Sequence, residues 1–176
     1  DDITAEKLPT IDLEYLFLQI RIKSVGETSD IAMNCDQCET ENEVTVDLEA
    51  AEVKREKEVS NVVKLTDDIS LELQFANYEA MRGLDISTED TNTKDAFQLI
   101  QRCITSVVQG DEVYTKDDFS EKELERFMDS MSLEMLDGMQ DYLASAPTLS
   151  VTAEFKCKTC DNEQKTVLEG IGNFFD

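Results

Sequence analysis

The sequence predicts an α+β protein in which β-hairpins are brought together by four cysteines. Two C-x-x-C pairs, Cys35 with Cys38 and Cys157 with Cys160, each lie between stretches that alternate apolar and polar residues. Segments with helical spacing lie between the two pairs, which predicts a helical insertion. A strongly apolar segment near the start predicts a buried N-terminal helix.

That first helix is expected over residues 10–24, TIDLEYLFLQIRIKS, and Gly26 suits the turn that ends it. The segment is apolar almost all round, so it should be buried between two layers or partly against another chain. Tyr15, Leu18 and Ile22 are spaced at three and four residues. We expect them to form an outward side that another protein covers.

Alternation with the period of a strand occurs in three places. Val44, Val46 and Leu48 alternate with polar residues after the first cysteine pair. Residues 69–75 repeat the pattern after a turn at 67–68. Residues 149–155 alternate directly into the second cysteine pair, and residues 166–168 lead away from it.

Two helices are expected in the middle of the chain. Residues 93–110 have apolar side chains at helical spacing, with Gly110 as a stop. The second helix begins with a capping-box spacing at Ser120 and Glu123 and ends before Pro147. Its methionine-rich stripe fits an adaptable binding face or, the favoured interpretation, the core. The stripe comprises Leu124, Phe127, Met128, Met131, Met135, Met139, Tyr142 and Leu143.

Each cysteine pair is predicted at the tip of a strand–turn–strand, where both sulfurs can point one way. Two such tips facing each other supply four thiolates, the tetrahedral set that Zn²⁺ prefers in a closed structural site. The sequence therefore predicts zinc-ribbon-like hairpins that hold one structural Zn²⁺ through Cys35, Cys38, Cys157 and Cys160. Between Cys38 and Cys157 lie 118 residues, which exceeds the usual ribbon spacing and implies an insertion closed off by the metal.

Other uses of the cysteines are less favoured. A redox C-x-x-C usually sits at a helix N-terminus and would not need two copies. Two disulfides would need an oxidising compartment, and an empty site or an iron–sulfur cluster remains an alternative. Cys103 lies on the apolar side of its predicted helix, where a lone cysteine is usually a small core residue.

The 176 residues are predicted to form a single domain, residues 1–176. Its zinc-knuckle halves would span about 28–50 and 148–170, with the strand and helical insertion at about 51–147. The chain begins with Asp1 rather than Met, so we expect a missing N-terminal segment.

The composition disfavours several functions. Acidic residues outnumber basic ones 40 to 16, and the net charge of −24 repels a phosphate backbone. Nucleic-acid binding is therefore not expected. No apolar run reaches the roughly 18 residues of a membrane span. The chain has no histidine and only six glycines without a phosphate-binding loop, and a four-cysteine site has no open position for substrate. We expect no enzyme.

Several stretches resemble the baseplate hub subunit and hub assembly protein family of T4-like contractile-tailed bacteriophages. The specific element is DLEYLFLQIRIKSVGE, followed by CDQC and the acidic strand EVTVDL. The closing FKCKTCDNEQKTVLEGIGNFF is similar to the end of the same family. The resemblance covers most of the chain, and the middle helices are its least distinctive part.

The resemblance implies a late viral protein that acts with other hub proteins in building the tail baseplate. Its place would be the host cytoplasm during assembly, or the tail baseplate of the virion. It implies no catalytic residues, and the metal role of the cysteines rests on their spacing alone. The alternative function is an acidic zinc-ribbon regulatory or adaptor module that binds another protein.

Overall fold

The computed structural model describes residues 4–55, 57–85 and 93–175. The chain divides into two compact units. Unit 1 combines Asp1–Thr10 with Lys57–Ala146, and unit 2 combines Ile11–Glu56 with Pro147–Asp176. Unit 2 is thus built from segments on both sides of the long segment of unit 1. The sequence predicts an insertion at about 51–147, which lies between the two segments of unit 2 as the long segment of unit 1 does. That the whole chain folds as a single domain stays a prediction.

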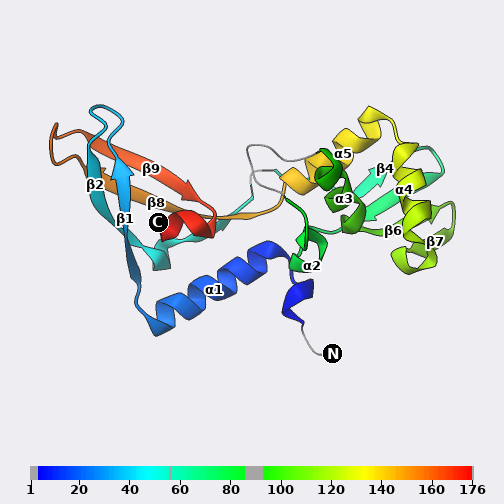
Figure 1. The fold of residues 1–176 in the computed structure, drawn as a ribbon, viewed down its shortest axis with the longest axis horizontal. Helices are drawn as coiled ribbons and strands as arrows, with labels where there is room; N and C mark the ends of the chain where they lie inside the picture. Colours follow the sequence, from blue (N-terminus) through cyan, green and yellow to red (C-terminus); the bar gives the residue numbers. More distant parts are fainter. Residues whose placement is uncertain (1–3, 56, 86–92, 176) are drawn as a thin grey trace. The chain divides into compact units, whose positions relative to one another are not determined.

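The described residues of unit 2 form one α-helix and two antiparallel sheets (Figure 1). Its sheets are the hairpin β1-β2 and a three-stranded sheet with the order β3-β8-β9. Its elements are α1 (Thr10–Ser24, whose first residue belongs to unit 1), β1 (Thr28–Asn34), β2 (Glu41–Asp47), the 3-10 helix η2 (Leu48–Ala50), β3 (Glu52–Lys54), β8 (Thr148–Lys156), β9 (Glu163–Glu169) and the 3-10 helix η4 (Ile171–Phe174).

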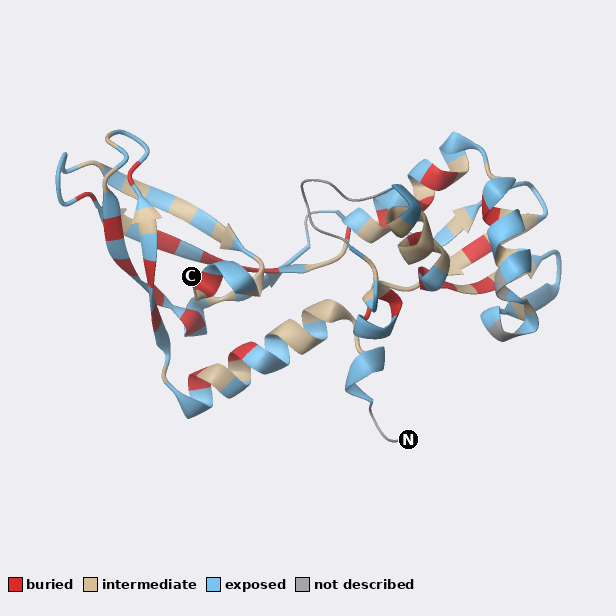
Figure 2. Ribbon diagram, viewed as in Figure 1, coloured by how far each residue is buried: buried red, intermediate tan, exposed pale blue. Residues whose placement is uncertain are grey.

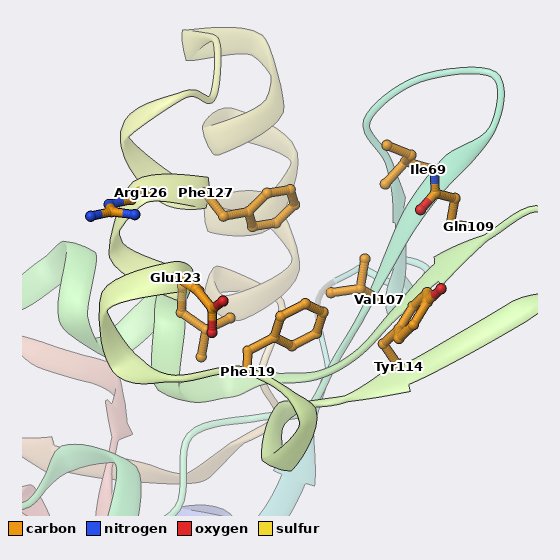
Figure 3. A pocket seen from close by; sticks show the side chains of 9 residues that line it. Ile69, Val107, Gln109, Tyr114, Phe119, Glu123, Arg126 and Phe127 are labelled. Carbon is orange, nitrogen blue, oxygen red and sulfur yellow. The ribbon is translucent and has the colours of Figure 1, made fainter.

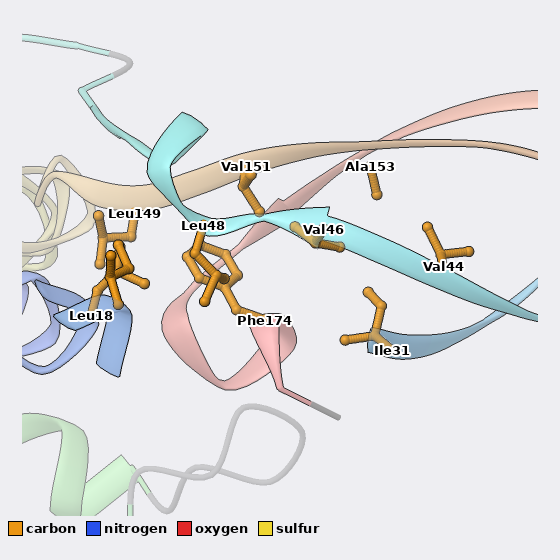
Figure 4. Close-up of a cluster of buried hydrophobic side chains, with 10 residues drawn as sticks. Leu18, Ile31, Val44, Val46, Leu48, Leu149, Val151, Ala153 and Phe174 are labelled. Atoms are coloured by element: carbon orange, nitrogen blue, oxygen red, sulfur yellow. The ribbon is translucent and has the colours of Figure 1, made fainter. Parts of the chain in front are cut away.

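The core of unit 2 follows from alternation along its strands. Burial alternates strictly in β2 because successive side chains of a strand point to opposite faces (Figure 2). Figure 4 shows the resulting cluster, in which Leu18 of α1 lies beside Leu149 of β8 and Phe174 lies beneath Leu48. Complete burial of one such side chain contributes roughly 1.5–3 kcal/mol. The buried members are Leu18, Ile22, Ile31, Val44, Val46, Leu48, Leu149, Val151, Ala153 and Phe174.

Helix α1 differs from the prediction. Leu18 and Ile22, expected on the outward side, are buried in the core of unit 2. Of the three outward candidates, Tyr15 alone is exposed. The helix is also not buried as a whole, since Leu16 is 49% and Ile20 64% exposed. The prediction of the outward side was wrong because apolar residues surround this helix, so that spacing does not identify its buried side.

Unit 1 is a four-stranded antiparallel sheet with the order β4-β5-β6-β7, together with helices (Figure 1). Residues of β5, β6, α3, α4 and α5 form its core, with Leu71, Ile104 and Met139 among the most deeply buried. Its elements are η1 (Ala5–Lys7), β4 (Val62–Lys64), β5 (Ile69–Leu73), α2 (Tyr78–Met81), α3 (Thr93–Cys103), β6 (Ile104–Gln109), β7 (Glu112–Thr115), η3 (Lys116–Asp118), α4 (Glu121–Asp129) and α5 (Leu133–Ala144).

The helix predicted over 93–110 is correct only as far as Cys103. Residues 104–109 instead form β6, which pairs with β5 and β7. The β-branched residues of this stretch, from Ile104 to Val108, favour a pleated surface. Gly110, expected to end a helix, lies in the β6–β7 turn with a φ of 59°. A left-handed backbone there suits glycine in a tight hairpin turn.

The second predicted helix is two helices. Ser120 and Glu123 form the predicted capping box at the start of α4, which is confirmed. A second cap at Ser132, whose side chain accepts from the Met135 N–H, begins α5. Met128 and Met139 are buried, so the core interpretation of the methionine stripe is confirmed for these two residues. Among the residues described, no helix is long and apolar enough to cross a membrane.

Candidate metal centre

The four predicted cysteines lie together in unit 2. Cys35 and Cys38 occupy the loop between β1 and β2, and Cys157 and Cys160 occupy the loop between β8 and β9. These loops lie at the same end of the unit (Figure 1). All four Sγ atoms lie within 4.8 Å of one another. The structure therefore assembles one sulfur cluster from two segments that are far apart in the sequence.

The two cysteine loops have the same backbone conformation. In the first, the Cys35 N–H donates to the Thr40 carbonyl at 3.0 Å; in the second, the Cys157 N–H donates to the Asn162 carbonyl at 2.8 Å. The residue after each second cysteine is left-handed, with a φ of 56° at Glu39 and 57° at Asp161. Each loop therefore turns back on itself and directs both its sulfurs to one side.

The sulfur distances fit a tetrahedral metal site. Cys35 Sγ lies 3.6 Å from Cys160 Sγ, and Cys38 Sγ lies 3.6 Å from Cys157 Sγ. Four thiolates at the usual Zn–S length of about 2.3 Å around a tetrahedral ion are about 3.8 Å apart. Cys35 and Cys157 are buried, while Cys38 is half-buried and Cys160 exposed. Four sulfurs in this arrangement leave no coordination position for a substrate.

Backbone N–H groups favour the ionised form of one cysteine in each loop. The Gln37 N–H lowers the pKa of Cys35, and the Cys160 N–H lowers the pKa of Cys157 to about 6. The Asn162 N–H acts to lower the pKa of Cys160, but desolvation and the neighbouring sulfurs outweigh it and raise that pKa to about 12. Thiolates are the metal-binding form of cysteine, so the backbone of the loops favours the ligand form of Cys35 and Cys157.

Two side-chain amides, which were not among the predicted site residues, connect the loops. Asn42 Oδ1 accepts a hydrogen bond from the Lys158 N–H, and Gln164 Oε1 accepts one from the Asp36 N–H, each at 3.0 Å. Asn42 Nδ2 also lies 3.8 Å from Cys157 Sγ. Asn42 shares the inward face of β2 with Val44 and Val46. A polar residue at an inward position that otherwise carries valine is the one sequence feature that could have indicated its role.

Cys103 does not belong to the cluster. It lies at the end of α3 in unit 1, fully buried, and burial raises its pKa to about 11. The predicted role as a small apolar core residue agrees with this position.

The comparison with known families decides the identity of the chain. A family model described as T4 bacteriophage base plate protein matches residues 1–176. The chain belongs to this family of phage baseplate proteins. No match was found among curated proteins or among solved structures. The resemblance to T4-like baseplate proteins noted in the sequence is therefore confirmed at the level of the family.

Membership of the baseplate family implies a structural role and protein partners. Helix α1 has apolar side chains that are accessible to such partners. They are the exposed residues Tyr15, Leu16, Phe17 and Ile20. Phe17 also makes an edge-to-face contact with Phe175, with ring centroids 6.0 Å apart. An aromatic and aliphatic surface of this kind is typical of a protein contact site.

Proposed function

We propose that this baseplate protein acts in assembly of the tail hub through protein–protein contacts, and that Cys35, Cys38, Cys157 and Cys160 hold a structural Zn²⁺. The mutual distances of the four Sγ atoms, all within 4.8 Å, are the observation that carries the metal assignment. Bound there, the ion would supply a cross-link between the β1–β2 and β8–β9 loops.

This cross-link would offset an entropic cost that the order of segments in this chain creates. The two loops are separated in sequence by all of the unit 1 segment Lys57–Ala146. Bringing distant segments together costs loop-closure entropy, and a metal that joins them offsets this cost.

The surface that would contact another hub protein is the exposed side of α1. Leu16 and Ile20 are four residues apart, and they therefore share one side of the helix. Leu18 and Ile22 of the same helix pack into the core of unit 2, which holds that side in place. A hub protein that covers Leu16 and Ile20 would bury apolar surface worth about 25 cal/mol for each Å².

Co-expression with the other hub proteins of the same phage tests this function. Wild-type chain should purify in a complex of defined mass, and Leu16→Asp combined with Ile20→Asp should abolish the complex. Leu133→Asp is the matched control, because Leu133 is an exposed leucine at the start of another helix. Failure of the wild type to bind any hub protein would contradict the hub role. Binding by the double variant would remove α1 as the contact surface.

A further inference from the structure

A cavity of about 480 Å³ lies within unit 1, between helix α4 and the sheet (Figure 3). Phe119 and Phe127 extend from the helical side, and Val107 and Tyr114 extend from the strands opposite. The volume lies within the roughly 300–1,000 Å³ of ordinary ligand pockets. Its walls are mostly apolar side chains, comprising Ile69, Val107, Tyr114, Phe119, Leu124 and Phe127.

The cavity is the uncovered end of the sheet face on which the helices pack. Leu71 and Leu73 of β5 are fully buried in the core of unit 1, whereas Ile69 on the same face is half-buried. Val107, which pairs with Leu71, is also half-buried. The apolar face of the sheet thus continues beyond the part that is packed, and space remains for a further apolar group.

Glu123 and Arg126 line this apolar space, and the carboxylates of Glu112 and Asp118 act on Tyr114 of its wall. Tyr114 donates a hydrogen bond to Glu112, and this bond, together with the charges of Glu112 and Asp118, raises the pKa of Tyr114. Glu123 lines the cavity, and its pKa is lowered first by hydrogen bonds from Ser120 and more weakly by Arg126. The segment 109–129, which supplies most of this wall, contains eight acidic residues and three basic ones, so its net charge is negative.

We infer that the cavity receives one apolar side chain carried on a basic segment of a partner protein. This inference rests on the proposed role in protein contacts and adds the chemistry of the partner. The apolar walls select the buried side chain, and the carboxylates attract the lysines or arginines beside it. A second copy of this chain is a poor occupant, because two chains of charge −24 repel each other.

A short capped peptide with one central phenylalanine between lysines is the probe. Titration calorimetry with the wild-type protein should show binding that weakens as salt rises. The same peptide with alanine in place of phenylalanine should bind about tenfold or more weakly, the effect of about 1.4 kcal/mol lost from a buried anchor. A peptide with glutamates in place of the lysines should not bind.

Variants locate the binding site. Val107→Phe fills the cavity and should weaken binding of the phenylalanine peptide about tenfold. Val113→Phe is the matched control, since Val113 is 62% exposed on the neighbouring strand and does not line the cavity. If Val107→Phe alters the circular dichroism spectrum, Leu124→Glu replaces it, because Leu124 is a half-buried wall residue of α4.

Three results would overturn the inference. The first is equal affinity of the wild type for the phenylalanine and alanine peptides, which would reduce the interaction to surface charge. The second is the absence of peptide binding, and the third is binding that the cavity variants do not change. None of these results would affect co-purification with hub proteins through α1, so failure of this inference is distinguishable from failure of the proposed function.

Discussion

Asn42 and Gln164 occupy equivalent positions, each seven residues after the first cysteine of its loop. Each amide oxygen accepts a hydrogen bond at 3.0 Å from the backbone N–H that follows the first cysteine of the opposite loop. The two loops are thus held to each other reciprocally, by protein atoms alone. This pairing keeps the four sulfurs together and reduces the ordering that a bound metal would have to impose.

Replacement of Asn42 by leucine should weaken the metal centre. Asn42 is only 4% exposed, and its loss leaves the Lys158 N–H without its partner. We expect the free energy of unfolding to fall by about 1–3 kcal/mol and metal affinity to fall by about 10–100-fold. Circular dichroism in urea and competition with a chelator measure the two effects.

Asn173→Leu is the control for that substitution. Asn173 is an exposed asparagine of the same unit, and its side chain donates to the Glu169 carbonyl away from the cysteines. It should leave metal affinity unchanged. Equal metal affinities of Asn42→Leu and the wild type would show that the amides do not support the centre.

Cys103→Ala should leave the metal content unchanged. Cys103 is fully buried in unit 1 and is not a member of the sulfur cluster, so the change removes a small apolar group and costs roughly 1 kcal/mol of stability. Elemental analysis and thermal unfolding measure the two quantities. Loss of metal in this variant would overturn the assignment of the four ligands.

The buried and exposed sides of α1 can be distinguished by replacing Leu18 or Leu16 with alanine. Leu18 is 1% exposed in the core of unit 2, so its truncation should cost about 2–5 kcal/mol. Leu16→Ala should change the free energy of unfolding by about 0.5 kcal/mol or less, as at other exposed positions. Urea denaturation compares them, and equal losses of stability would contradict the orientation of the helix.

The capping box of α4 should make stability depend on pH. Hydrogen bonds from Ser120 lower the folded-state pKa of Glu123 below its ordinary value of 4.5. Its stabilising contribution is therefore complete above that value and is lost as pH falls through the lowered folded-state pKa. Glu123→Gln should melt at a lower temperature than the wild type at pH 7. A difference that does not shrink as the pH falls through the lowered pKa of Glu123 would contradict this origin.

The cysteine hairpins could be predicted because two signals agreed there. Alternation located the strands, and the C-x-x-C pairs located the turns that join them. The register of both hairpins places each cysteine pair directly at the end of the ladder, after Asn34 and Lys156. The zinc-ribbon description stays a prediction, whereas the antiparallel hairpins and the sulfur cluster are features of the structure.

Other features could not be predicted because one local pattern fits two structures. The apolar spacing up to Val107 suits a helix, but pairing of Ile104 and its neighbours with β5 makes the segment a strand. The buried side of α1 depends on Leu149 and Phe174, which are distant in sequence from Leu18. The partners of Asn42 and Gln164 likewise belong to the opposite loop, so neither sequence neighbourhood reveals them.

The number of Zn²⁺ ions bound per chain tests most directly the claim that the four clustered cysteines hold a structural metal. Protein kept reduced throughout purification should carry one Zn²⁺ per chain by native mass spectrometry, and Cys38→Ser should carry less than the wild type. Binding of structural zinc is worth about 10–16 kcal/mol in small peptides, so that variant should also lose several kcal/mol of stability. A wild-type chain that is folded, reduced and free of metal in zinc-containing buffer would contradict the account.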